Sequence, residues 1–290
     1  MSAASGPIFV GGLSYSGKTQ VRSMLAAHAE LQLTRRTALW DRYFGRFGDL
    51  DDPGALARCL DTMAHDPRLD VLAPDVVAIE RQLADGPRTY ARVFGMAHAR
   101  AAERAGKRRW GEQLGFVERY ADAIFAEHPD ACMIHMIRDP RDRAAEMFAA
   151  GAARRGRLGW ETAKWAQSAG LAVRNEERFA RPSYVVVRYE ELVARPVETL
   201  TMLCGLIGES VEPAMVEVAS GLHFDVVSPS PVCARFVERA VAQDLLRFGY
   251  RASGGADGST GGRRRPRPLD RCGAAAWRMT DQRLARRTGR

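Results

Sequence analysis

Hydrophobic residues along the chain form short continuous runs that are separated by longer stretches with helical spacing. The runs predict strands at 8–10, 131–137 and 183–189, and the segment 107–113 is predicted as a further short strand that ends in a turn. Helical spacing of apolar residues begins at Val21, Met24 and Leu25. The further helices predicted in this way are 54–64, 74–83, 89–105, 116–127, 140–153, 160–179, 196–207, 212–219 and 231–248.

Strands that alternate with helices predict an α/β fold with a mostly parallel sheet flanked by helices. The segment 54–105 holds helical patterns without a strand signal, so we expect a helical insertion after the first strand–helix unit. A single domain is expected over 1–251. From Ala252 the chain is rich in glycine, serine, arginine and proline without apolar periodicity, which predicts a disordered basic tail over 252–290.

The net charge of +8 is concentrated in that tail, which holds ten arginines and three aspartates. The remaining residues carry 33 basic and 32 acidic side chains. A body so close to neutral argues against a nucleic-acid-binding surface there. For the tail two interpretations stay open, a solvating appendage and a contact with an acidic partner or membrane surface.

Targeting and redox signals favour a cytoplasmic protein. No apolar run approaches the ~20 residues of a membrane span, and the N-terminus lacks the pattern of a secretory signal. The five cysteines are scattered and form no C-x-x-C pair, which indicates reduced thiols and neither a disulfide framework nor a zinc site.

A glycine-rich loop follows the first predicted strand. Gly12, Gly17, Lys18 and Thr19 match G-x-x-x-x-G-K-[ST], and a helical pattern comes directly after them. Backbone N–H groups in such a loop surround an anion, and the helix N-terminus adds a partial positive charge. Lysine occurs only three times in this arginine-rich chain, which suggests that position 18 requires an ammonium group. The alternative is an ordinary glycine turn before a helix.

Arginines follow two of the later predicted strands. Arg138 comes directly after the apolar run 131–137, and Arg188 lies at the end of 183–189. Ligands of parallel α/β sheets bind at the carboxyl ends of the strands, so we expect both arginines on the same edge as Lys18.

A cluster of aromatic and basic residues follows the first helix. It consists of Arg35, Arg36, Trp40, Arg42, Tyr43, Phe44 and Phe47. One interpretation is a connecting helix with a packed face and a solvated face. The other is a wall of the nucleotide or acceptor pocket, because bases stack well on aromatic rings.

Four segments together resemble the 3′-phosphoadenosine 5′-phosphosulfate (PAPS)-dependent sulfotransferases. FVGGLSYSGKT is similar to the FVGG-x-x-R-S-G-T-T loop of that family, and WGEQ at 110–113 is similar to W-G-[DE]-K. MIHMIRDPRD at 133–142 resembles the family's strand and R-[DN]-P-[RK]-D, while VVVRYEELVARP at 185–196 resembles R-Y-E-[DE]-L.

The resemblance implies a P-loop NTPase-like domain that uses PAPS as its co-substrate and requires no metal. It places the phosphosulfate on the glycine-rich loop and the 3′-phosphate on Arg138. Sulfuryl transfer to a hydroxyl or amine of a small-molecule, glycan or lipid acceptor would follow. The residues that it assigns to the co-substrate are Gly12, Ser16, Gly17, Lys18, Thr19, Gln20, Arg138, Arg188 and Tyr189.

Three positions depart from the family pattern. Tyr15 stands where the family has arginine or lysine, with the lysine of this chain three positions later, and Gln113 replaces the usual lysine of W-G-[DE]-K. Glu146 stands where the family commonly supplies a serine to the 3′-phosphate. Because a carboxylate repels phosphate, we expect Glu146 either to turn away or to weaken co-substrate binding.

Transfer to a hydroxyl needs charge neutralisation and a general base within hydrogen-bond reach. We assign neutralisation to Lys18 and take Glu112 as the first candidate base, because it lies at a strand end, with His28 second. The alternative for Glu112 is a solvated turn carboxylate. His135 lies within an apolar run and is expected to be a core histidine with satisfied hydrogen bonds.

Two other function classes remain open. A P-loop kinase using ATP and magnesium would account for the literal G-x-x-x-x-G-K-T. However, magnesium chemistry favours an apolar strand that ends directly in aspartate, and here arginine comes first. A nucleotide-binding module without catalysis is the other alternative, because of Glu146 and Gln113.

Overall fold

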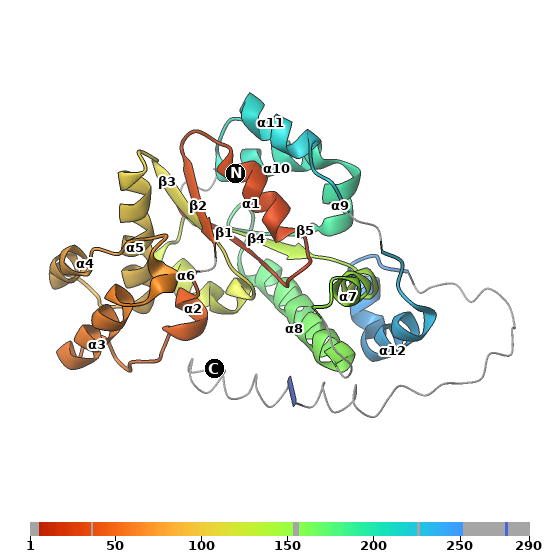
Figure 1. The fold of residues 1–290 in the computed structure, drawn as a ribbon, viewed down its shortest axis with the longest axis horizontal. Coiled ribbons are helices and arrows are strands. Elements are labelled where there is room, and N and C mark those ends of the chain that lie inside the picture. Colours follow the sequence, from red (N-terminus) through yellow and green to blue (C-terminus); the bar gives the residue numbers. More distant parts are fainter. Residues whose placement is uncertain (1–5, 36, 153–156, 225–226, 252–275, 278–290) are drawn as a thin grey trace, which may run out of the picture.

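The protein is described by a computed structural model over residues 6–35, 37–152, 157–224, 227–251 and 276–277. Its sheet has five parallel strands in the order β2-β3-β1-β4-β5 (Figure 1). The strands are β1 (Ile8–Gly12), β2 (Leu31–Arg35), β3 (Arg109–Gln113), β4 (Cys132–Ile137) and β5 (Tyr184–Arg188). The predicted α/β fold with a parallel sheet is confirmed.

Helices cover both faces of the sheet. The α-helices are α1 (Lys18–Ala26), α2 (Leu39–Arg42), α3 (Pro53–Ala64), α4 (Val76–Gln82), α5 (Tyr90–Arg104), α6 (Ala121–Glu127), α7 (Pro140–Ala149), α8 (Arg157–Arg178), α9 (Tyr189–Ala194), α10 (Pro196–Ile207), α11 (Pro213–Ser220) and α12 (Pro231–Arg247). Helices α1, α10 and α11 lie together beside the sheet (Figure 1). Their apolar side chains pack with Ile8 and Val10 of β1. Phe9, which alternates with them, packs toward α2, α5 and α6.

Strand β2 was not predicted. The sequence LQLTR is short and comes directly after the first helix, so it carries little strand signal of its own. It becomes the edge strand because it pairs with β3 in parallel register, with Leu31 opposite Arg109 and Arg35 opposite Gln113. The helical insertion, α3 to α5, therefore follows β2 rather than the first strand–helix unit.

The aromatic cluster packs into the core. Trp40 on α2 is 2% exposed and contacts Phe94, Tyr120 and Phe44, with ring centroids 5.1, 5.4 and 5.5 Å apart. These contacts agree with the packed-face interpretation, although the single long connecting helix is replaced by β2 and the short α2. None of the cluster's described aromatic residues lines the pocket at the phosphate loop.

The start of α7 follows its sequence signals. Asp139 caps the helix by accepting a hydrogen bond from the Arg141 amide at 2.9 Å, and Pro140 occupies the first turn. Helix α9 is not among the helices predicted from the sequence. Its first residue, Tyr189, follows β5 immediately, so this residue enters the edge of the sheet where ligands bind.

The predicted disordered tail, 252–290, lies outside the described residues except at positions 276 and 277. Trp277 is helical and 7% exposed. Its ring stacks on Phe116 with centroids 5.7 Å apart and meets Trp160 of α8 edge-on at 5.0 Å. Trp277 thus packs against the domain, while disorder of the remaining tail stays a prediction.

No described helix combines the length and apolar character that a membrane span requires.

Candidate active site

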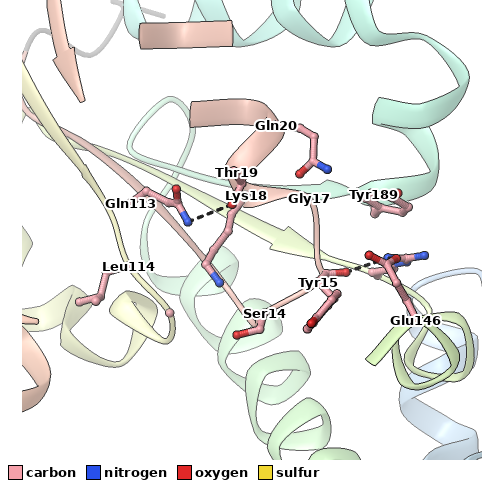
Figure 2. A pocket seen from close by; sticks show the side chains of 12 residues that line it. Ser14, Tyr15, Gly17, Lys18, Thr19, Gln20, Gln113, Leu114, Glu146 and Tyr189 are labelled. Atoms are coloured by element: carbon pink, nitrogen blue, oxygen red, sulfur yellow. Dashed lines mark hydrogen bonds and ion pairs between the residues drawn. The ribbon is translucent and has the colours of Figure 1, made fainter. Parts of the chain in front are cut away.

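A pocket of about 530 Å³ opens at the carboxyl ends of the central strands. It lies beside the glycine-rich loop and the first turn of α1, and Figure 2 shows the side chains that surround it. Six of the nine predicted co-substrate residues line it: Gly17, Lys18, Thr19, Gln20, Arg138 and Tyr189. The structure therefore brings together segments that are more than one hundred residues apart in the sequence.

The loop backbone depends on two glycines with positive φ. Gly12 has φ +110°, and a Cβ on it would overlap the Met136 carbonyl oxygen. Gly17, the residue before α1, has φ +91°, and a Cβ there would lie 2.7 Å from the Tyr189 ring. Ser16 is buried and donates its hydroxyl to the Leu13 carbonyl at 2.7 Å, so its side chain closes the loop from within.

A buried carboxylate supports the first glycine from below. Glu118 is fully buried and accepts a hydrogen bond from the Gly12 amide at 3.0 Å. Its other oxygen accepts from Ser168 Oγ at 3.0 Å and lies 3.3 Å from His135 Nε2. Sequence reasoning missed Glu118, because the segment GFVERY around it matches none of the motifs considered. Only the fold brings it under the loop.

The predicted core role of His135 is confirmed. Its Nδ1 lies 2.7 Å from the Tyr184 hydroxyl, and its Nε2 lies 2.8 Å from Ser168 Oγ. Burial lowers the pKa of His135, because a charged imidazolium would lose its hydration. The imidazole is thus held neutral within the network that supports the loop.

Lys18 is the first residue of α1 and lines the pocket. The neighbouring Thr19 Oγ1 accepts a hydrogen bond from Gln113 Nε2 at 3.4 Å (Figure 2). Gln113 Oε1 is buried and has no hydrogen-bond partner among the described residues. The end of the pocket at Lys18 thus combines an ammonium group, a helix N-terminus and the Gln113 side-chain amide.

Arg138 forms the other end of the pocket. Its Nη1 donates to the Tyr15 carbonyl oxygen at 3.0 Å and to Glu146 Oε2 (Figure 2). Its guanidinium group lies over the Tyr189 ring, 4.0 Å from the centroid. Arg138 is only 4% exposed, and its Nε has no hydrogen-bond partner within the described part of the chain.

A second pocket of about 280 Å³ adjoins the first. Arg138 and Tyr189 line both pockets, and the walls of the second are mainly apolar, including Val193 and Phe224. The Tyr189 and Phe224 rings meet edge-on, with centroids 5.8 Å apart. An anion-binding pocket that continues into an aromatic one matches a phosphorylated nucleotide with its base.

A model of the sulfotransferase family matches residues 7–213 of this chain. The chain belongs to the sulfotransferase family. Its fold is similar to a sulfotransferase from Alicyclobacillus acidocaldarius, at 18% identity over 85% of this chain and 95% of that one, with a TM-score of 0.50. For sulfotransferase STF9 from Mycobacterium avium the identity is 11% over 87% and 79% of the two chains, with a TM-score of 0.51. No curated protein sequence matches this chain significantly.

The family membership and the P-loop-like α/β fold that the motifs predicted are confirmed. The family model covers all four motif segments, from the phosphate loop to the R-Y-E-E-L segment. The described residues contain no cluster of histidine, cysteine or acidic side chains that could hold a metal ion.

Arg188 of this sulfotransferase does not reach the pocket with Arg138. It stands at the predicted edge, but its guanidinium group lies over the Tyr250 ring at 4.8 Å and its Nε lies 3.7 Å from Glu190 Oε2. These two partners, from the C-terminal part of the domain and from α9, draw the side chain away. The prediction that both arginines lie on one edge of the sheet agrees with the strand register, in which Ile137 is opposite Arg188, but the Arg188 side chain does not line the pocket.

Neither proposed base lines the pocket. Glu112 is fully buried, accepts a hydrogen bond from the Thr37 hydroxyl and lies 3.4 Å from His98 Nε2, so it is not a solvated turn carboxylate. His28 follows α1 at the end remote from Lys18, with its Nε2 3.5 Å from Glu212 Oε1. The structure therefore does not bring His28 to the site.

One carboxylate with a raised pKa, which lines a separate pocket with Arg42 and Gly45, was missed. Asp41 on α2 is solvent-accessible, yet burial of its carboxyl group raises the pKa to about 6. The guanidinium of Arg119 opposes this shift, and the Tyr120 hydroxyl lies 3.5 Å from Asp41 Oδ1. Asp41 lies on α2 within the aromatic and basic cluster after the first helix, where no motif marks it.

Proposed function

We propose that the protein transfers the sulfuryl group of PAPS to a hydroxyl or amine of a small-molecule, glycan or lipid acceptor. The observation that carries the proposal is the continuous site in which Lys18 and Arg138 face one nucleotide-sized cavity. ATP has no 3′-phosphate, whereas PAPS carries one in addition to its phosphosulfate. Two separate cationic positions therefore favour the bisphosphorylated nucleotide.

In the bound complex, the loop amides and Lys18 would hold the 5′-phosphosulfate and Arg138 would hold the 3′-phosphate. The aromatic pocket behind Tyr189 and Phe224 would take the adenine by ring contacts. Arginine suits the phosphate because its fork can donate two parallel hydrogen bonds. Gly12, Ser16 and Gly17 act through the loop backbone, and Thr19 and Gln20 border the phosphosulfate.

The reaction is an in-line displacement at sulfur. The acceptor oxygen or nitrogen forms a bond to sulfur while the bond from sulfur to the 5′-phosphate oxygen breaks, and 3′,5′-adenosine bisphosphate (PAP) leaves with that electron pair. The acceptor proton passes to a general base. Lys18 neutralises the charge that builds up on the equatorial sulfuryl oxygens and on the leaving phosphate.

Two carboxylates remain candidates for the base. Glu112 keeps this assignment if acceptor binding opens its contact with Thr37. Asp41 is the second candidate, because its raised pKa of about 6 suits proton abstraction near neutral pH. Asp41→Asn and Glu112→Gln separate them, because only the true base variant loses the acidic limb of the pH–rate profile. For Asp41 that limb has its midpoint near pH 6, and activity rises above it.

A kinase is less well supported. Asp139 follows Arg138 at the end of β4, where a magnesium-binding aspartate would stand in a P-loop kinase. Its carboxylate instead accepts hydrogen bonds from Arg141 Nη2 at 2.6 Å and Nε at 3.0 Å, and it caps α7. Binding magnesium would break both interactions.

Cellular location and tail contacts belong to the same proposal. The four described cysteines, Cys59, Cys132, Cys204 and Cys233, are free thiols, which supports a cytoplasmic, reducing environment. The arginines after Ala252 would provide a contact for an acidic surface, while the nearly neutral body would not bind nucleic acid.

Calorimetric titration with PAP, 5′-AMP and ATP plus magnesium tests the proposal. We expect PAP to bind most tightly, and Arg138→Ala to weaken PAP about 10- to 100-fold while 5′-AMP changes little. Arg178→Ala is the matched control, because Arg178 is exposed and paired with Asp122 on α6. The proposal fails if PAP binds no better than ATP, or if Arg138→Ala leaves PAP binding unchanged.

Transfer itself is measured with sulfur-labelled PAPS and a panel of phenol, sugar, lipid and amine acceptors. Transfer of the sulfur label to an acceptor would support the proposed sulfotransferase activity. Tight PAP binding without transfer to any acceptor would favour the non-catalytic nucleotide-binding module.

A further inference from the structure

The acceptor groups around Arg138 are unusual for a phosphate site. A backbone carbonyl, from Tyr15, and a carboxylate, from Glu146, both accept hydrogen bonds from Nη1 of Arg138. Glu146 also lines the pocket, so its carboxylate stands where the anion that Arg138 serves would approach. Arg138 is the one basic residue that lines both adjoining pockets within the described part of the chain.

Arg138 is held in place more firmly than Glu146. The arginine is 4% exposed, lies 4.0 Å above the Tyr189 ring and donates to the loop backbone. Glu146 is 23% exposed and projects from the second half of α7, so its side chain can turn into solvent. When an anion competes for Arg138, Glu146 is therefore the partner that moves.

The surroundings add negative charge at this end of the pocket. Asp142, one helical turn before Glu146, lines the second pocket together with Glu190. Arg141 is directed to Asp139 and Glu238, and Arg188 is directed to Glu190 and Tyr250. The charged side chains nearest to the ligand-binding face of Arg138 are therefore acidic, and the neighbouring arginines are paired elsewhere.

We infer that Glu146 is a built-in competitor for Arg138 that sets the affinity of the site for 3′-phosphorylated nucleotides. This inference rests on the proposed function. A phosphate on the guanidinium group of Arg138 would be repelled by the carboxylate that Nη1 already holds, so the 3′-phosphate binds more tightly when Glu146 turns away. PAPS and PAP carry the same 3′-phosphate. Glu146 therefore weakens both, and it promotes release of PAP after each turnover.

The inference predicts a gain of binding from a substitution in the pocket. In Glu146→Gln we expect the dissociation constant of PAP to fall about tenfold, since an uncharged amide no longer repels the phosphate, while that of 5′-AMP changes less than about twofold. Glu238→Gln is the matched control. It removes one negative charge from a carboxylate that pairs with Arg141 rather than with Arg138, and we expect no change for either nucleotide.

The double variant Arg138→Ala/Glu146→Gln shows whether Glu146 acts through Arg138. If it does, Glu146→Gln gives no gain in the Arg138→Ala background, so the two effects are strongly non-additive. Stopped-flow release of PAP gives the matching kinetic result, with slower dissociation from Glu146→Gln than from the unmodified protein.

Three results would overturn the inference: unchanged or weaker PAP binding by Glu146→Gln, an equal gain for 5′-AMP, or a full gain in the absence of Arg138. These outcomes differ from failure of the proposed function. That failure appears in the unmodified protein and in Arg138→Ala, as a lack of preference for PAP over 5′-AMP that Arg138 does not affect. Loss of the Glu146 effect alone leaves the PAP preference intact.

Discussion

The two ends of the pocket have different electrostatic designs. At one end Lys18 begins helix α1, and the loop below it rests on the buried Glu118. At the other end Arg138 already has a carboxylate partner in Glu146. The comparison teaches that two cations lining one cavity need not be equivalent. One is organised by backbone amides and a helix N-terminus, and the other must exchange an internal anion for its ligand.

The largest effect is expected from removing the ammonium group at the first end. Lys18→Met should lower the rate of sulfuryl transfer about 10²- to 10³-fold, because the charge that develops in the transition state loses its nearest cation. PAP affinity should fall much less, since the loop amides remain. Single-turnover transfer and calorimetry measure the two quantities.

Lys107→Met is the control for that experiment, because Lys107 donates to the Ala29 carbonyl at 2.6 Å, away from the pocket. If Lys18→Met transferred sulfate at the normal rate, Lys18 would have no catalytic role and the two ends would not differ in this way.

A substitution in the loop backbone also tests how the Lys18 end of the pocket differs from the Arg138 end. Gly12→Ala should weaken PAP binding about tenfold or more, because a Cβ would overlap the Met136 carbonyl and φ +110° is unfavourable for alanine. Gly106→Ala is the control. Gly106 also has positive φ, at +67°, but a Cβ there meets nothing within 4 Å, so only the smaller backbone strain remains. Equal effects of the two variants on PAP binding would contradict a specific role of the loop.

Adding a positive charge at the Lys18 end of the pocket should increase the electrostatic difference between the two ends. Gln113→Lys should raise the transfer rate a few-fold, because a second ammonium group beside Thr19 would face the phosphosulfate. Gln32→Lys is the control, since Gln32 lies on β2 opposite Trp110, toward the start of β3. A lower rate in Gln113→Lys would show that Gln113 serves the site through its amide rather than leaving a place for a cation.

The smallest effect concerns the support beneath the loop. Burial lowers the pKa of His135 in the folded protein, whereas the unfolded chain titrates near ~6.5. The unfolded state therefore binds more protons below that pH, and the free energy of unfolding should fall as the pH decreases through about 6.5. Urea unfolding at several pH values measures this slope. Glu118 contacts both His135 and Gly12. Protonation of His135 should therefore also disturb the support of the phosphate loop.

His135→Gln should reduce the pH dependence, although it also lowers stability at neutral pH by removing one of the contacts with Tyr184 and Ser168. An unchanged slope in this variant would assign the titration to another group, such as His128, whose pKa burial also lowers.

Most of the fold follows from local sequence patterns. Apolar runs predicted β1, β4 and β5, a short strand was also predicted at β3, and helical spacing predicted the helices of the insertion closely. Strand β2 escaped prediction because five residues of mixed polarity become a strand only through pairing with β3. Short edge elements depend on their neighbours more than on their own propensity.

The candidate site was only partly predictable. Lys18 and Arg138 reach the pocket because the ends of parallel strands fix their backbone positions. Arg188 occupies an equivalent position, yet its side chain turns to Glu190 and Tyr250. Glu112 was expected at an accessible strand end and is instead buried beside Thr37 and His98. The position of a residue in the sequence predicted at which edge of the sheet its backbone lies. It did not predict which side chains it contacts.

The sequence by itself determined the parallel α/β fold, the phosphate loop and the cap of α7, because short-range patterns of glycine, apolar and capping residues specify backbone shape. Only the tertiary structure decided which charges meet. Arg138 donates to Tyr15, 123 positions away in the chain, and it pairs with Glu146 across the start of α7. Side-chain partners depend on distances that folding creates, so the sequence marked Glu146 as unfavourable for the 3′-phosphate, but only the folded protein shows that Glu146 pairs with Arg138.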